Sequence, residues 1–217
     1  MRHGTWGLAA AAAYAGLCHL GRTWGSTTEE RRRSLPGDEL IPGPMVVTNH
    51  AITIRGRRED VWPWLTQMGW HRGGWYTYRW IDRVLFPANA PSADVILAEY
   101  QDLAAGDRIP DGPPESGCDF VVERVEAPSL LVLRSRSHLP PWPKDRWLDW
   151  VWTYSLTQDT DRQVRLQLRT TASLGPPWLA LVYRALVWTD FVMSRSHLRG
   201  IEARVAGNVV MEGREVG

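Results

Sequence analysis

The chain has 217 residues, of which 44% are hydrophobic and 23% are charged, and its net charge is +1. These values are typical of one globular domain with additions. They exclude the strongly basic surface of a nucleic-acid-binding protein, so we expect no nucleic-acid partner. Two cysteines, Cys18 and Cys118, without C-x-x-C spacing make a disulfide scaffold a poor explanation and favour a reducing, cytoplasmic location.

Residues 1–22 are rich in alanine and predict a helix. Arg2 and His3 precede an apolar run that ends near Leu20 and is short for a membrane span, which needs about 20 apolar residues. A basic start and a short apolar core also fit an export signal. Three interpretations stay open: a helix packed on the domain, a weak membrane anchor, or an uncleaved export signal. We favour a helix that packs on the domain or touches a membrane. We therefore expect a cytoplasmic protein, with membrane association as the alternative.

Residues 23–44 are rich in glycine, proline and charge and predict an extended lead-in outside the core. Residues 45–55 alternate between apolar and polar, which predicts a strand. The residues expected on one face of this strand are Val46, Thr48, His50, Ile52 and Ile54.

An aromatic cluster follows the strand. Residues 58–87 predict a helix capped by Asp60, a glycine break, and a second amphipathic helix. Four large rings begin the second helix: Trp75, Tyr76, Tyr78 and Trp80. Tyrosine and tryptophan rings favour sites where the apolar body of the ring is buried and its polar atom has a hydrogen-bond partner. We therefore expect the cluster to line a cavity, with core packing as the alternative for any single ring.

Strands are predicted at residues 119–126 and 130–138, followed by a hairpin of 147–157 and 163–174. One face of the hairpin is apolar and rich in rings: Leu148, Trp150, Trp152, Tyr154 and Leu156 on the first strand, and Val164, Leu166, Leu168, Thr170 and Ala172 on the second. Arg165, Gln167 and Arg169 alternate with them and are expected to face water.

One long helix is predicted from Trp178 to Val205, after a start at Pro176-Pro177. Its apolar positions follow helical spacing, so we expect it to cover the apolar face of the sheet. Arg184 and Asp190 argue against a membrane span. A lone buried carboxylate is costly, so Asp190 is expected either to find partners in the core, with Arg134 and Tyr154 as candidates, or to face a polar cavity.

The order of these elements resembles the START-like superfamily, also called SRPBCC, which has the helix-grip fold. Several stretches, in order, resemble its polyketide cyclase/dehydrase-like bacterial branch: LPGDE (35–39), VWPWL (61–65), GGWYTY (73–78), QDL with GD (101–103, 106–107), and FVM followed by LRGI (191–193, 198–201). The resemblance covers about residues 24–207. The ordered set is fairly specific, although no single stretch is.

The resemblance implies an α+β, helix-grip fold. In it a curved antiparallel β-sheet wraps around a long C-terminal α-helix, two short helices follow the first strand, and a hydrophobic ligand cavity lies between sheet and helix. The chain then divides into an N-terminal helix (1–22), a lead-in (23–44), a ligand-binding domain (45–207) and a tail (208–217). Such a fold does not imply a reaction, because its members range from lipid carriers to cyclases.

Motifs for other chemistries are absent from the sequence: it has no P-loop, G-x-G-x-x-G, H-E-x-x-H or G-x-S-x-G. Its six histidines have no metal-like spacing with cysteine or carboxylates, so we expect no metal and no cofactor. The residues expected to line the cavity are Trp75, Tyr76, Tyr78, Trp80, Arg134, Trp150, Trp152, Tyr154, Leu168, Thr170, Val182, Leu186, Thr189, Asp190 and Met193.

Proton transfer in such a cavity has weaker candidates. Tyr78 or Tyr154 would donate to a carbonyl, and His138 or Asp190 would move a proton. Asp102 is a further polar candidate for the cavity. The structural alternative is that its side chain caps a turn. The sequence thus leaves three functions open: binding of a lipid- or polyketide-like hydrophobic molecule, a cyclase or dehydratase acting on such a substrate, and a membrane-associated interaction protein. It predicts no oligomeric state.

Overall fold

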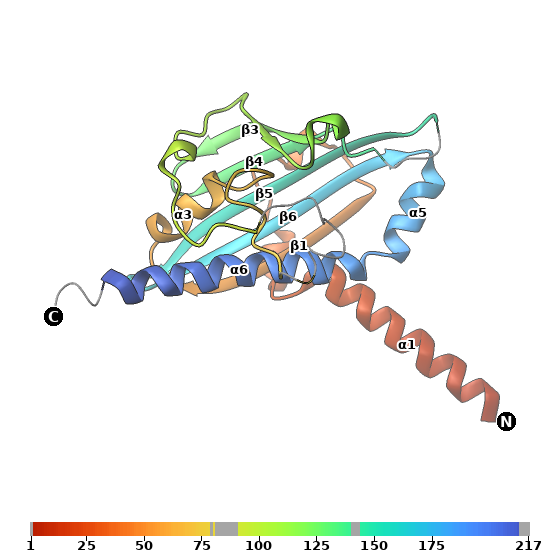
Figure 1. Ribbon diagram of the computed structural model, residues 1–217. Coiled ribbons are helices and arrows are strands. Elements are labelled where there is room, and N and C mark those ends of the chain that lie inside the picture. The colour runs from red at the N-terminus through yellow and green to blue at the C-terminus, as the bar shows by residue number, and fades with distance from the viewer. Residues whose placement is uncertain (1, 79, 81–90, 140–143, 213–217) are drawn as a thin grey trace.

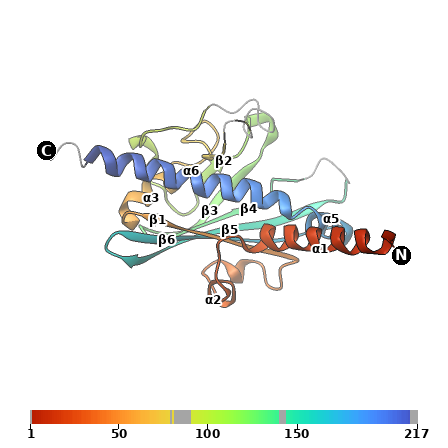
Figure 2. The ribbon, with the colours of Figure 1, turned by 90° about the horizontal axis from the view of Figure 1, so that it is seen from below.

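A computed structural model of the protein describes residues 2–78, 80, 91–139 and 144–212. Its centre is a six-stranded antiparallel sheet in the order β1-β6-β5-β4-β3-β2, with a C-terminal helix along one face (Figures 1 and 2). The strands are β1 (Val46–Arg55), β2 (Arg108–Pro110), β3 (Asp119–Glu126), β4 (Leu130–Ser135), β5 (Trp147–Thr160) and β6 (Gln163–Gly175). The α-helices are α1 (Arg2–Thr23), α2 (Thr28–Arg32), α3 (Arg58–Thr66), α5 (Pro177–Ala185) and α6 (Trp188–Glu212). Short 3-10 turns are η1 (Asp38–Leu40), η2 (Ala98–Tyr100) and η3 (Pro114–Ser116).

The predicted strand faces are confirmed in β1, β5 and β6. Tyr154 of β5 lies opposite Leu168 of β6, which in turn lies opposite His50 of β1, and all three side chains are buried. Because side chains alternate across a strand, this register places the whole apolar set of each strand on the same side. The sheet therefore presents one continuous apolar face.

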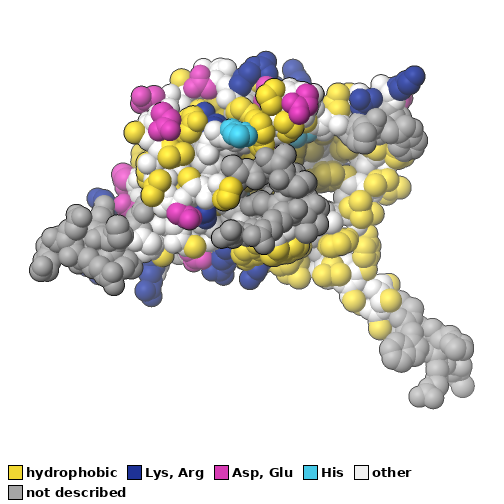
Figure 3. Space-filling model, viewed as in Figure 1, with side chains coloured by type: hydrophobic (Ala, Val, Ile, Leu, Met, Phe, Trp, Pro, Cys, Tyr) yellow, Lys and Arg dark blue, Asp and Glu magenta, His cyan; other side chains and the backbone are white. Residues whose placement is uncertain are grey.

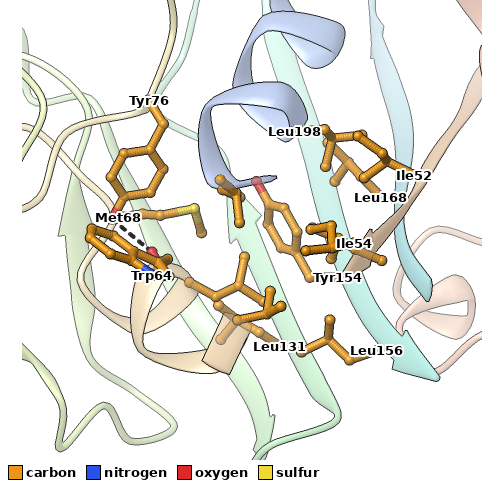
Figure 4. Packing of buried hydrophobic residues seen from close by; sticks show 14 of the residues in the cluster. Ile52, Ile54, Trp64, Met68, Tyr76, Leu131, Tyr154, Leu156, Leu168 and Leu198 are labelled. Atoms are coloured by element: carbon orange, nitrogen blue, oxygen red, sulfur yellow. Dashed lines mark hydrogen bonds between the residues drawn. The ribbon is translucent and has the colours of Figure 1, made fainter. Parts of the chain in front are cut away.

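The core lies between this face and helices α3 and α6. Trp64 of α3, Tyr154 of β5 and Leu198 of α6 are among its fully buried members, and Figure 4 shows them converging from three elements. The hydroxyl of Tyr76 donates to the carbonyl of Trp64 (2.8 Å), which satisfies the polar tip of a buried ring. This is the α+β arrangement of the helix-grip fold, with an open sheet and a long C-terminal helix.

The opposite face of the sheet differs from the prediction. Gln167 and Arg169 are buried rather than facing water, because the segment before β1 lies over them. The guanidinium of Arg169 donates to Asp38 (2.6 Å) and to Asn49 (2.8 Å), and to the carbonyl of Glu30 (2.8 Å). Residues 23–44 are thus not an extended lead-in outside the core. They form α2 and η1, and they bury Leu35 and Ile41.

Two predicted helices also need correction. The C-terminal helix is interrupted at Leu186-Val187, which separates α5 from α6. After α3, which is confirmed, residues 75–78 are not helical as we predicted. Trp80 is helical, and residues 79 and 81–90 of the predicted second helix lie outside the described residues.

Helix α1 contacts the domain through its C-terminal half, which includes Tyr14, and extends away from the domain toward its N-terminus (Figure 1). Its Gly21 is buried, and a Cβ there would lie 2.4 Å from the carbonyl oxygen of Val187, so the helix backbone touches the α5–α6 junction directly. The carbonyl of Gly21 accepts a hydrogen bond from His50 Nε2 (2.9 Å). No helix among the described residues combines the length and apolar character that crossing a bilayer requires.

Candidate ligand-binding cavity

A cavity of about 210 Å³ lies between the sheet and the C-terminal helices. Its lining residues come from four places: Trp150, Trp152, Tyr154 and Leu168 on the sheet, Tyr183, Thr189, Asp190, Met193, Ser194 and His197 on α5 and α6, Trp75 and Thr77 after the glycine break, and Asp111 after β2. Sites for drug-sized ligands have roughly 300–1,000 Å³. This cavity therefore suits a small molecule or one end of a longer one.

Aromatic rings in edge-to-face contact make one wall of the cavity. The ring centroid of Trp152 lies 5.6 Å from that of Trp75 and 5.1 Å from that of Trp150, both in edge-to-face geometry. Phe120 of β3 supports them from behind, 4.5 Å from Trp152. Such contacts fix the rings in place and leave their remaining surface for an apolar ligand.

A tyrosine–histidine pair joins the sheet to α6. Nδ1 of His197 lies 2.6 Å from the carbonyl oxygen of Trp75, which only accepts, so Nδ1 carries the proton. Nε2 then accepts from the hydroxyl of Tyr154 (3.1 Å). Burial lowers the pKa of His197 to about 4 and raises the pKa of Tyr154, so both side chains are neutral at pH 7.

Asp190 lies in a buried polar cluster beside the cavity. The hydroxyl of Thr48 donates to its Oδ2 (3.0 Å), and Ser194 lies 3.4 Å from its Oδ1. His50 Nδ1 is 3.9 Å from Oδ2. Because His50 Nε2 donates to the carbonyl of Gly21, its Nδ1 is the nitrogen that faces the carboxyl group.

Burial controls the protonation of this cluster. It raises the pKa of Asp190, against the lowering effect of His50 and of the hydrogen bonds from Thr48 and Ser194. It also lowers the pKa of His50. Both pKa shifts favour the neutral forms, in which the Asp190 carboxyl group is protonated and the His50 ring is uncharged. The Asp190 side chain keeps 17% of its surface exposed, so it remains within reach of a molecule in the cavity.

The structure places many of the predicted cavity residues on the cavity wall: Trp75, Trp150, Trp152, Tyr154, Leu168, Thr189, Asp190 and Met193. That they bind a ligand stays a prediction. The expected partners of Asp190 were wrong, since Thr48 and His50 occupy that role, Tyr154 bonds to His197, and Arg134 lies on the other face of the sheet. There Arg134 pairs with Asp149 at 2.6 Å, and alternation along β4 explains its direction because its neighbour Leu133 points inward.

The other aromatic candidates lie away from the cavity. Tyr76 is buried in the core against Trp64, and Trp80 is largely exposed. Tyr78 is partly exposed, and its hydroxyl accepts from Arg195 (3.2 Å). Residues 75–78, which we predicted to be helical, have irregular backbone.

Four further candidates lie away from the cavity wall. Thr170 is buried but does not reach the cavity wall. Val182, within α5, and Leu186, at the break that follows it, are about half exposed, at 45% and 49%. The side chain of Asp102, considered for proton transfer, is exposed and away from the cavity.

His138 lies behind the cavity wall instead of on it. Its Nε2 is 2.9 Å from Asp111 Oδ2, and its Nδ1 is 2.5 Å from the hydroxyl of Ser135. Its ring packs 4.7 Å from that of Phe120. Of this group, Asp111 lines the cavity, and His138 contacts Asp111 without reaching the cavity wall itself.

Our sequence interpretation missed His197, Ser194, Tyr183, Thr77 and Asp111. A signal for two of them was present: Asp190, Met193, Ser194 and His197 follow the i, i+3, i+4, i+7 spacing of one helix face. Among the histidines, we considered only His138 for proton transfer, so His197 was not among the candidates. No group of three or more His, Cys, Asp or Glu residues that could hold a metal occurs in the described part of the chain.

The fold and the cavity define an α+β protein of the helix-grip class. No protein-family model and no curated protein matches the chain. Among solved structures, a protein from Mesorhizobium loti is 18% identical, with a TM-score of 0.43 over 74% of this chain and 97% of that chain. A conserved protein from Geobacillus kaustophilus is 16% identical, with a TM-score of 0.42 over 75% and 96%. Norcoclaurine synthase from Thalictrum flavum is 14% identical, with a TM-score of 0.35 over 71% and 94%. Likenesses at this level assign neither a ligand nor a reaction.

Proposed function

We propose that this protein binds a small hydrophobic molecule, lipid- or polyketide-like, that carries a carbonyl or hydroxyl group. The observation that carries the proposal is the composition of the cavity wall. Aromatic and aliphatic side chains make most of it, and a few polar groups on α6 lie together on one side. Ligand sites combine an apolar lining with a small number of placed polar groups in this way.

The arrangement also gives the ligand an orientation. An apolar body packs against the rings of Trp75, Trp150 and Trp152, while a polar group reaches Asp190 on the opposite side. A carboxyl group whose pKa is raised by burial donates a hydrogen bond to a carbonyl oxygen more readily than an ordinary aspartate does. A ligand without any polar group would leave Asp190 unpaired on that side and would bind more weakly.

Native mass spectrometry of the full chain, purified from its own host, tests this proposal. The expected result is a protein peak with the added mass of one small molecule, which disappears on denaturation. Ser194→Phe, which fills the cavity, should abolish the added mass. Ala203→Phe, on an exposed position of the same helix, should retain it. A wild-type protein that carries no molecule, and also takes up none from a lipid extract, would contradict the proposal.

A second candidate, a cyclase or dehydratase, is favoured by one observation. Asp190 and the Tyr154–His197 pair line the same cavity, so a proton donor and a proton acceptor lie next to any bound carbonyl compound. Incubating the protein with the molecule it retains tests this candidate. Conversion by the wild type and its loss in Asp190→Asn, with the retained mass unchanged, would support an enzyme. A molecule recovered unchanged would leave binding as the function.

A further inference from the structure

A continuous apolar surface lies outside the cavity, where α1 meets the α5–α6 junction. We define it as the junction surface. Its exposed members are Leu8, Tyr14, Leu17 and Leu20 on α1, and Leu181, Val182, Leu186 and Trp188 on and after α5. In Figure 3 it appears as yellow side chains over α5 and the adjoining part of α1, whereas other parts of that view mix apolar and charged side chains. Exposed apolar surfaces of this kind mark sites of interaction.

Contacts between the two helices hold the junction surface together. The hydroxyl of Tyr14 donates to the carbonyl of Ala185 (2.6 Å), and Gly21 touches the backbone of Val187. These contacts fix the position of α1 against α5. The surface is therefore a built feature of the folded chain, formed by segments that are far apart in sequence.

Charge on the junction surface has one sign. Residues 1–28 and 177–189 contain no aspartate or glutamate, and their charged residues are Arg2, Arg22 and Arg184. Arg22 and Arg184 are exposed. Apolar side chains flanked by arginine, without acidic residues, match the outer layer of a bilayer that contains anionic lipids. Tyr14 and Trp188 are ring types that favour the boundary between headgroups and acyl chains.

The shape of α1 favours a bilayer over a second copy of the chain. Every side chain from Leu8 to Leu17 is exposed, so the helix offers no single face for a protein partner. It extends away from the domain (Figure 1). The segment from Leu8 to Leu20 is roughly 20 Å long at 1.5 Å per residue, whereas the hydrocarbon core is about 30 Å thick. The segment is therefore too short to cross the hydrocarbon core and would enter the lipid from one side.

From these observations we infer that the junction surface docks the protein onto an anionic lipid bilayer. Leu181, Val182 and Leu186 enter the lipid together with α1, and Arg22 and Arg184 contact the headgroups. The inference does not depend on the cavity having a ligand. Tyr183, which lies on α5 with Leu181 and Val182, lines the cavity. Docking would therefore bring one wall of the cavity close to the lipid surface.

Vesicle sedimentation with the full chain tests this inference. The wild type should sediment with phosphatidylcholine vesicles that contain phosphatidylglycerol, and less with phosphatidylcholine alone. Leu181→Glu and Leu186→Glu should each lower the partition coefficient roughly tenfold. Both positions are exposed, so unchanged thermal unfolding should confirm that the variants fold. Arg22→Gln combined with Arg184→Gln should remove the preference for the anionic vesicles.

Val95→Glu is the matched control, since Val95 is 63% exposed and lies outside the junction surface. It should bind vesicles as the wild type does. Three results would overturn the inference: no sedimentation of the wild type with either vesicle, equal loss of binding in Val95→Glu and Leu181→Glu, or a wild-type dimer in solution that ignores vesicles and becomes monomeric in Leu181→Glu. The last result would assign the surface to a second copy of this chain.

Discussion

The hydroxyl of Tyr154 lies 3.1 Å from Nε2 of His197, and this hydrogen bond connects the middle of the sheet to the helix that covers it. Both residues line the cavity, so the same contact that positions α6 also forms part of the candidate site. Stability and ligand binding are therefore expected to be coupled at this pair, which makes it the first target for mutation.

Tyr154→Phe should lower the free energy of unfolding by about 1–3 kcal/mol, because Nε2 of His197 would be left as a buried acceptor without a donor. Urea unfolding at pH 7 measures this. Tyr78→Phe removes a hydroxyl of the same kind from an exposed pair with Arg195 and should change stability by less than about 0.5 kcal/mol. Equal effects of the two substitutions would show that the Tyr154 hydrogen bond has no special role.

Acid should destabilise the protein through His197. Its pKa is about 4 in the folded state and 6.5 in its ordinary state, so the unfolded chain binds the extra proton between these values. The resulting stability is fully present above pH 6.5 and is lost as the pH falls toward 4. The His197 contribution has a slope of up to about 1.4 kcal/mol per pH unit. Urea midpoints from pH 7 to 4.5 should fall less steeply in His197→Gln than in the wild type, and parallel curves would contradict the assignment.

Asp190 should make stability depend on pH in the opposite direction from His197. Burial raises its pKa above the ordinary value of 3.8, so the folded state keeps a proton that the unfolded chain releases. The stability linked to that proton is present below pH 3.8 and is lost as the pH rises through the folded-state pKa. Asp190→Asn cannot release this proton and still accepts from Thr48. Its stability relative to the wild type should therefore increase with pH, whereas a difference that is constant from pH 4 to 8 would contradict a raised pKa.

Gly200 permits the close approach of α6 to the loop that carries Tyr76. A Cβ at this position would lie 1.9 Å from the carbonyl oxygen of Tyr76, so Gly200→Ala should destabilise the fold by at least about 1–3 kcal/mol. Gly207 lies on the same helix with nothing within 4 Å of its Cβ position. Gly207→Ala should therefore be neutral or stabilise by up to about 1 kcal/mol, the gain expected from helix propensity. Thermal unfolding of both variants measures the contrast, and similar losses at the two positions would contradict this packing.

Local patterns in the sequence predicted the parts of the fold that depend on local rules. Alternation along β5 and β6 predicted the face that carries Trp152 and Tyr154, and Pro176-Pro177 marked the start of α5. These signals work because side-chain direction follows the backbone period. The same period explains why most of the sheet residues predicted for the cavity do reach it.

Features that depend on long-range contacts were not predictable in this way. The break at Leu186 has no glycine or proline at that position, and packing of Gly21 against Val187 supports it from a distant helix. The burial of Arg169 depends on Asp38, which lies far away in the sequence and reaches it only after the segment before β1 folds over the sheet. Alternation alone cannot distinguish a face covered by such a segment from a face covered by water.

A direct binding titration tests the central claim, that the cavity between the sheet and α6 is a ligand site. The apolar fluorescent probe N-phenyl-1-naphthylamine is titrated into the full chain, Ser194→Phe and Ala203→Phe. We predict saturable binding of one probe molecule to the wild type and to Ala203→Phe, and affinity at least about tenfold weaker in Ser194→Phe, because the new ring occupies the cavity. A wild type that shows no saturable binding, or a folded Ser194→Phe that binds the probe as tightly as the wild type, would contradict the claim.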